Sequence, residues 1–241
     1  MQELKLKGEV TASPYIKDIY RRLRTNIEFT GVENKVIAVT SCEAADGKST
    51  ISYNLARIFA ESDKKVLYID ADMRNSHNYN RLGYNKEIKG LSHYLSGKEN
   101  MTEVMYTTNY RKLVILPTGV FPKNPTELLG KQRFANLITA SKNAFDYVII
   151  DTPPLGAVVD AAVVAKECDG SILVIPSDKI SRRTAKNVKE QLVQANPNLL
   201  GVVLNQVDAK ATGYGKKYGY GYGYGYGYGY GYGENEEKKK Q

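Results

Sequence analysis

Short apolar runs rich in Val, Ile and Leu recur along the chain. Most of them are continuously apolar instead of alternating with polar positions, which is typical of strands covered by helices on both faces of a sheet. The predicted strands are 35–41, 65–70, 112–119, 146–151, 170–176 and 201–207. The pattern therefore indicates a buried, mostly parallel sheet.

Segments with helical periodicity separate these runs. The predicted helices are 14–29, 50–62, 126–142, 160–167 and 181–195. Strands that alternate with helices are typical of βαβ units, so we expect an α/β fold with a doubly wound sheet in residues 30–208. Residues 1–29 should form an N-terminal helical arm.

The final segment, 209–241, is dominated by alternating tyrosine and glycine. Glycine removes every second side chain, and ordering the backbone costs about 1–2 kcal/mol per residue, so we expect a disordered tail. Two interpretations stay open on the tail alone: a self-associating low-complexity segment, or a set of accessible phenols. Its tyrosines are Tyr214, Tyr218, Tyr220, Tyr222, Tyr224, Tyr226, Tyr228, Tyr230 and Tyr232.

Charge and composition narrow the class of protein. The formal net charge is +8, but Lys and Arg are spread along the chain without a stripe, so we expect no specific nucleic-acid partner. No window approaches the roughly 18 apolar residues that a bilayer span requires, which predicts a soluble, cytoplasmic protein. The two cysteines and two histidines show no zinc-ligand spacing, so we expect no metal cage of protein ligands.

The loop "SCEAADGKST" at 41–50 connects the first predicted strand to a helix. It partly matches the P-loop pattern G-x-x-x-x-G-K-[ST], with Cys42 in place of the first glycine, and predicts a P-loop NTPase-like fold. Lys48 would reach the β and γ phosphates, and the Ser49 hydroxyl would bind Mg²⁺. A run that only opens a helix is the alternative for this loop alone. The predicted nucleotide-binding residues here are Ala45, Asp46, Gly47, Lys48, Ser49 and Thr50.

Two further predicted strands end in carboxylates. Asp70 and Asp72 follow the strand in "VLYIDADMR", and Asp151 ends the strand in "YVIIDTPP". A lone aspartate at a strand end is usually a turn former. Ligands of open α/β sheets bind beyond the carboxyl ends of the strands, so we expect these side chains to converge beside the P-loop. Mg²⁺ on a nucleotide takes one or two carboxylates plus waters, which favours a Mg·nucleotide site.

Together with the arm "SPYIKDIYRRLRTNI" at 13–27, these motifs resemble the bacterial tyrosine kinase (BY-kinase) family that regulates capsule and exopolysaccharide synthesis. More narrowly, the chain is similar to the cytoplasmic kinase subunit of the two-protein systems (CpsD/CapB type). The resemblance covers nearly the whole chain. It implies an ATP-dependent, autophosphorylating protein-tyrosine kinase, in which the nine tail tyrosines are the phosphorylation sites.

The resemblance also implies roles for single residues. Lys48 would bind the β and γ phosphates of ATP, and Asp70 would accept or orient the proton of the attacking phenol. Asn205, at the end of a late strand, would contact the adenine. The implied metal environment is Ser49, Asp72 and Asp151. The implied catalytic set is Lys48, Asp70, Asp72 and Asp151.

The chain departs from the family pattern at two places. Ala44 and Ala45 occupy loop positions where the family has Pro and Gly. If position 45 requires a positive φ, alanine costs about 1 kcal/mol there and would weaken nucleotide binding. The arm carries Asp18, Arg21 and Arg24 where the family's subunit-interface motif is Glu-x-x-Arg-x-x-Arg. This implies a homo-oligomer, which could be a ring, with a shorter acid in the contact.

The resemblance further implies three features outside the chain: a transmembrane polysaccharide co-polymerase adaptor that activates the kinase, a cognate tyrosine phosphatase, and a peripheral location at the inner face of the cell membrane through the adaptor. Two alternatives stay open. A partition-type P-loop ATPase would carry an additional early lysine, which "SCEAAD" at 41–46 lacks, and has no use for nine phenols. A non-catalytic, ATP-binding scaffold with a self-associating tail would fit the Tyr/Gly alternation.

Overall fold

The structure is a computed structural model that describes residues 1–7, 13–85 and 87–207. Met1–Val207 forms one compact unit. The tail, including all nine predicted phosphorylation sites, lies outside the described residues. Its expected disorder therefore stays a prediction.

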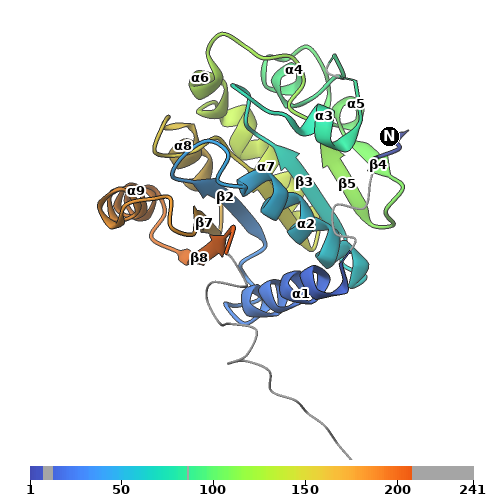
Figure 1. The fold of residues 1–241 in the computed structure, drawn as a ribbon. Helices are drawn as coiled ribbons and strands as arrows, with labels where there is room; N and C mark the ends of the chain where they lie inside the picture. Colours follow the sequence, from blue (N-terminus) through green and yellow to red (C-terminus); the bar gives the residue numbers. More distant parts are fainter. Residues whose placement is uncertain (8–12, 86, 208–241) are drawn as a thin grey trace, which may run out of the picture. The chain divides into compact units, whose positions relative to one another are not determined.

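An eight-stranded sheet forms the centre of the described part, in the order β1-β4-β5-β3-β6-β2-β7-β8 (Figure 1). The strands are β1 Gln2–Leu4, β2 Val36–Ser41, β3 Val66–Asp70, β4 Tyr106–Thr108, β5 Leu113–Leu116, β6 Tyr147–Asp151, β7 Gly170–Pro176 and β8 Leu199–Asn205. All neighbours from β5 to β8 are parallel, whereas β4 is antiparallel to β5. The predicted mostly parallel sheet is confirmed.

Helices cover both faces of this sheet. They are α1 Pro14–Glu28, α2 Lys48–Glu61, α3 Asn78–Leu82, α4 Leu91–Leu95, α5 Met101–Val104, α6 Pro125–Leu129, α7 Gln132–Ala144, α8 Asp160–Ala165 and α9 Arg182–Ala195. One apolar cluster joins the sheet to α4–α9, and a second joins it to α1–α3. Within β2, Val36 and Ala38 contribute to the first cluster, whereas Ile37 and Val39 contribute to the second. This division explains the continuously apolar run in the sequence, because both faces of the strand are buried.

The structure differs from the predicted elements mainly where elements are short. The predicted helix 126–142 is divided into α6 and α7, with Gly130 and Lys131 between them. β5 ends at Leu116, before Pro117, which has no N–H to donate to the sheet. Three short helices and β4 lie between residues 71 and 111, for which no element was predicted, and β1 precedes the arm helix.

The predicted arm helix is present as α1, which begins with Pro14 directly after Ser13. Proline suits the first position of a helix because its missing N–H has no partner there. α1 packs along α2, where Lys17 Nζ lies 2.7 Å from Glu61 Oε2 and Ile27 is buried. None of the helices in the described part is long and apolar enough to cross a membrane.

Candidate active site

The loop between β2 and α2 has the geometry of a phosphate cradle. Gly47 lies immediately before α2 with φ of 93°, and a Cβ there would come within 2.0 Å of Asn205 Nδ2, so only glycine fits. Lys48 and Ser49 are the first residues of α2. The first N–H groups of a helix have no partner inside the helix, and they attract anions.

Side chains at the end of β8 and directly after it hold this loop in place. The Asn205 amide donates to the carbonyl of Asp46 at 2.8 Å, and the Gln206 amide donates to the carbonyl of Ala45 at 3.1 Å. Ala45 has φ of 64°, which is the left-handed conformation that disfavours alanine. The strain expected at position 45 is therefore present. The adenine contact expected of Asn205 stays a prediction.

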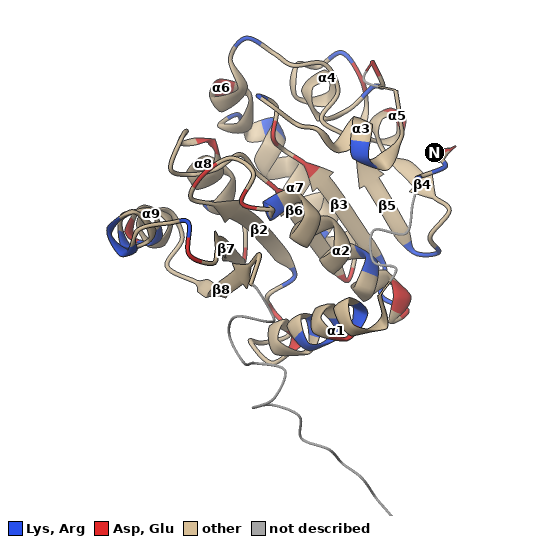
Figure 2. Cartoon of the chain, viewed as in Figure 1, with Lys and Arg blue, Asp and Glu red and all other residues tan. Residues whose placement is uncertain are grey.

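Lys48 lies at the centre of a buried group of charges. Its Nζ is 3.0 Å from Asp72 Oδ2, 3.8 Å from Asp151 Oδ1 and 3.1 Å from the Ser49 hydroxyl. Burial lowers the pKa of Lys48, but the carboxylates of Asp151 and Asp72 outweigh it, so that the pKa is raised overall. The lysine stays charged. Figure 2 shows the acidic end of β3 beside the basic start of α2.

The register of the sheet places Asp70 beside Asp151, because the two residues are partners at the ends of β3 and β6. Both side chains are completely buried. Burial, and next the charge of Asp151, raise the pKa of Asp70 to about 7. The Ser76 hydroxyl donates a hydrogen bond of 2.5 Å to Asp70 Oδ2. Asp70 can therefore exchange a proton near neutral pH, which suits a general base.

The residues present fit a magnesium ion bound together with a nucleotide. Asp151 Oδ1 is buried and has no hydrogen-bond partner among the described residues. Within the same residues, no group of three or more His, Cys, Asp or Glu side chains could hold a metal ion. Mg²⁺ in nucleotide sites is held by phosphates, waters and one or two carboxylates, and this environment requires no cage of protein ligands.

An ion pair that the sequence did not reveal connects the two carboxylate-bearing loops. Arg74, which follows Asp72, places its Nε 2.7 Å from Asp160 Oδ2 and its Nη2 3.0 Å from Asp160 Oδ1. The Thr126 hydroxyl donates to Asp160 Oδ1 at 2.5 Å and accepts from Arg74 Nη2 at 2.9 Å. Asp160 is buried at the start of α8, at the end of the segment that follows β6. The pair therefore joins the segment after β3 to the segment after β6.

Most of the chain is similar to known proteins. The model of the AAA domain family matches residues 34–200. Tyrosine-protein kinase CpsD of Streptococcus agalactiae serotype III (strain NEM316) is 44% identical over 199 residues, which cover 83% of this chain and 86% of that protein. The chain belongs to the bacterial tyrosine-protein kinases.

Two further members of this kinase family agree with the assignment. Tyrosine-protein kinase YwqD of Bacillus subtilis (strain 168) is 39% identical over 188 residues, covering 77% of this chain and 79% of that protein. The solved kinase domain of the Escherichia coli tyrosine kinase ETK has a TM-score of 0.77 and 33% identity, covering 90% of this chain and 80% of that chain. Membership of the kinase family decides against the partition-type ATPase and the non-catalytic scaffold.

The structure brings some predicted residues of this kinase together and leaves others apart. Lys48, Ser49, Asp70, Asp72 and Asp151 meet at one edge of the sheet, as expected. The three predicted interface residues lie away from this site, on the arm helix α1, where they were expected. There Asp18 and Arg21 pair with each other at 2.8 Å and remain exposed, and Arg24 lies 3.7 Å from Glu28. The predicted contact between subunits stays a prediction.

Proposed function

We propose that this kinase uses Mg·ATP to phosphorylate the tyrosines of its own C-terminal tail, in the same chain or in a neighbouring copy. The observation that carries the proposal is the position of Lys48, which lies at the start of the P-loop helix between Asp72 and Asp151. Asp70 is the sheet partner of Asp151. Groups suited to grip phosphate, to bind a metal ion and to accept a proton therefore lie together at one edge of the sheet.

The roles of the residues follow from what each can do. Lys48 stabilises the charge on the transferred phosphoryl group, for which it exchanges its carboxylate partners for phosphate oxygens. Ser49, Asp72 and Asp151 would hold Mg²⁺, which neutralises negative charge on the β and γ phosphates. The phenolic oxygen bonds to the γ phosphorus while the bond from that phosphorus to the β–γ bridging oxygen breaks. The phenolic proton passes to Asp70, and ADP leaves.

The test is an intact-mass measurement of the full chain before and after incubation with Mg·ATP. We expect successive increments of one phosphate each, mapped by peptide sequencing to tyrosines between Tyr214 and Tyr232. Lys48→Ala should show none. Release of ADP without any increment would indicate an ATPase and contradict the proposal.

We further propose that the kinase acts in capsule or exopolysaccharide synthesis with a transmembrane polysaccharide co-polymerase adaptor, and that a cognate tyrosine phosphatase reverses its modification. The support is the 44% identity to a kinase named CpsD. The adaptor would recruit the kinase to the inner face of the membrane. Recovery of the chain in the membrane fraction should depend on the adaptor, and a wholly adaptor-independent distribution would contradict this arrangement.

We also propose that α1 joins neighbouring subunits through Asp18, Arg21 and Arg24. Ile16 and Ile19, on the same helix, are partly exposed and would add apolar area to such a contact. Replacing both arginines with alanine should lower the mass measured by light scattering in the presence of ATP. A wild-type chain that is always monomeric would exclude this contact.

A further inference from the structure

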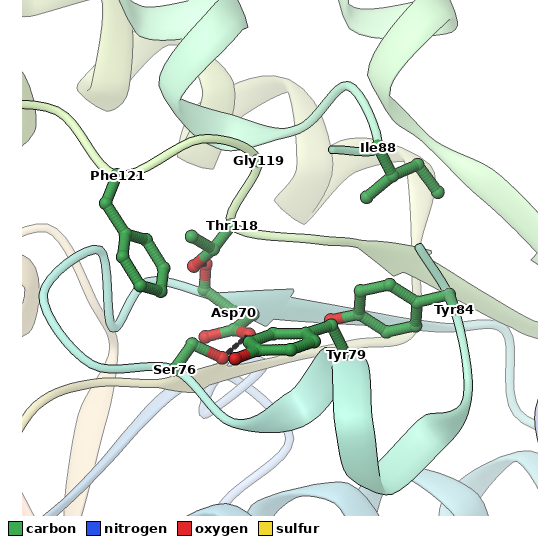
Figure 3. Close-up of a pocket in the computed structure, with 8 residues that line it drawn as sticks. All are labelled: Asp70, Ser76, Tyr79, Tyr84, Ile88, Thr118, Gly119 and Phe121. Atoms are coloured by element: carbon green, nitrogen blue, oxygen red, sulfur yellow. Dashed lines mark hydrogen bonds between the residues drawn. The ribbon is translucent and has the colours of Figure 1, made fainter. Parts of the chain in front are cut away.

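A hollow lies beside Asp70, on the side of β3 that faces β5 (Figure 3). Its lining includes Asp70, Ser76 and Thr118, together with the aromatic rings of Tyr79, Tyr84 and Phe121. Lys48 and Asp151 do not line it, and β6, which carries Asp151, is the neighbour of β3 on its other side. The hollow is therefore separate from the phosphate grip, and the two share only the neighbourhood of Asp70.

We propose that this hollow is the acceptor subsite of the kinase, and that it receives the phenol of a tail tyrosine with Phe121 and Tyr79 against the ring. The inference rests on the proposed function and adds a second binding surface to the active site, for the acceptor tyrosine. Its occupant is the tail, which is the chain's own tyrosine-rich segment and follows Val207.

The position of Asp70 supports this assignment. The side chain is completely buried, and its Oδ2 accepts from Ser76, while its backbone carbonyl accepts from the Thr118 hydroxyl at 2.7 Å. The carboxylate is thus fixed among the side chains that line the hollow, next to Ser76, as Figure 3 shows. A hydroxyl group that comes through the hollow meets the proton acceptor directly.

The aromatic lining of the hollow and the depth of Asp70 favour a phenol over an aliphatic alcohol. Rings gain from edge and offset contacts with other rings, and Phe121 is 39% exposed at the hollow, where an acceptor ring would cover it. A phenol carries its hydroxyl at the end of a rigid ring, whereas the serine hydroxyl is one carbon from the backbone. To reach the buried Asp70, a serine would have to bring its backbone into the hollow.

The Tyr/Gly alternation of the tail suits the same geometry. The hollow has room for about 10 Å³, far less than a phenol ring occupies. The proposal therefore requires the partly exposed rings of Tyr79 and Phe121 to move apart when an acceptor ring enters. Each tyrosine from Tyr220 to Tyr232 is flanked by glycine on both sides. Glycine lets the backbone approach a rim closely and adopt conformations that other residues avoid. The repeat therefore presents single rings without neighbouring side chains that would collide with the rim.

The first test requires no catalysis. A synthetic peptide with the sequence of residues 222–230 carries photoreactive p-azidophenylalanine in place of Tyr226, and is irradiated with the full chain and Mg·ADP. Mass spectrometry should map the cross-links to 76–84 and 118–121. The same peptide with unmodified tyrosine should reduce them by competition, whereas a peptide with leucine at every tyrosine should not. Cross-links confined to other surfaces, such as α1 or α9, would overturn the proposal.

The second test separates binding of the acceptor from binding of ATP. The acceptor is full-length Lys48→Ala chain, which the enzyme phosphorylates in trans. Phe121→Ala should raise the KM for this acceptor about three- to tenfold and leave the Kd for Mg·ATP unchanged, because the lost ring contact is one with the acceptor and not with ATP. Phe121→Tyr should restore the KM. The matched control is Val120→Ala, in the same loop, at a side chain that is 48% exposed and does not line the hollow.

Equal KM values for Phe121→Ala and Val120→Ala would contradict the acceptor subsite. Circular dichroism of both variants excludes unfolding as a cause of any difference. If the wild-type chain forms no phosphotyrosine at all, the proposed function fails, and the cross-linking result still decides whether the hollow binds the tail. The two failures are therefore distinguishable.

Discussion

On the β6 side of Asp70 the crevice is charged, whereas on the β5 side it is aromatic. On the charged side, Lys48 Nζ lies 3.0 Å from Asp72 Oδ2 and 3.8 Å from Asp151 Oδ1. The aromatic side is lined by rings that are partly exposed. Under the proposed function, this difference would let one sheet edge bind two unlike partners, since phosphate needs fixed charges and a ring needs apolar surface that can move aside.

The largest effect on tail phosphorylation should come from removing the positive charge of Lys48 on the charged side. Lys48→Ala should lower tail phosphorylation at least 1,000-fold, roughly the effect of losing several kcal/mol of transition-state stabilisation. The aromatic side should be unaffected, so photo-cross-linking of the tail peptide should stay within about twofold of wild type. Quantitative phosphotyrosine detection measures the first effect. Phosphorylation close to the wild-type rate would exclude this lysine as the phosphate grip.

Asp70→Asn should slow the chemical step, because Asp70 is the residue at which the charged and the aromatic sides meet. The amide keeps the shape of the side chain but cannot accept the phenolic proton, so kcat should fall about 100- to 10,000-fold. The Kd for Mg·ATP and the binding of the tail peptide should change little. Single-turnover kinetics with a fluorescent-nucleotide titration measure these quantities. A variant that loses nucleotide binding in proportion to its rate would place Asp70 in the phosphate site instead.

A smaller effect is expected from the Arg74–Asp160 ion pair, which joins the segments after β3 and β6 and is called the brace below. Arg74→Lys keeps the charge but loses the two parallel hydrogen bonds to Asp160, so kcat should fall about tenfold while the chain stays folded. Asp160→Asn should behave similarly. If the two residues act as one brace, the double variant is no worse than either single variant. Effects that multiply in the double variant would show that they act separately.

The smallest effect concerns the nucleotide loop alone. Ala45 has φ of 64°, so Ala45→Gly relieves backbone strain but also makes the unfolded chain more flexible. The free energy of unfolding should rise by less than about 1 kcal/mol, and Mg·ATP should bind up to about threefold more tightly. Acceptor binding should not change. Chemical denaturation and nucleotide titration measure the two effects, and a destabilised variant would show that the loop gains nothing from glycine.

Sequence patterns predicted β2, β3, β5, β6 and β7 well because each is an apolar run that is buried over most of its length. β8 was found from its apolar run as well, although Val202 and Leu204 in it are exposed. The convergence of Lys48, Asp70 and Asp151 was predictable for a similar reason, since the ends of neighbouring parallel strands meet at one edge. β1 and the short helices α3–α5 span three to five residues each, which is too few to show a period. Before the fold is known, no local signal pairs Arg74 with Asp160, which lies 86 positions away.

The aromatic hollow was also beyond prediction from sequence. Tyr79 follows β3, whereas Phe121 follows β5, and the two segments become neighbours only because β5 pairs with β3 in the sheet. Tyrosine and phenylalanine at these positions look like ordinary core or surface residues. The Ser76 hydrogen bond to Asp70 could have been suspected, because serine follows the carboxylate motif within the same short loop.

Asn205 and Gln206 are hydrogen-bonded to the nucleotide loop, so the distance along the chain from this loop differs for each tyrosine of the tail. The tail is tethered at the rim of the P-loop, and Tyr214 follows Gln206 by eight positions, whereas Tyr232 follows it by 26. Extended chains of these lengths span about 27 and 90 Å at most. The effective concentration of a tethered group is highest where the tether length matches the distance to be spanned. If the tail is the substrate, as proposed, its nine phenols would be unequal substrates, ranked by their place along the tail, and their phosphorylation would not depend on dilution of the assembled enzyme.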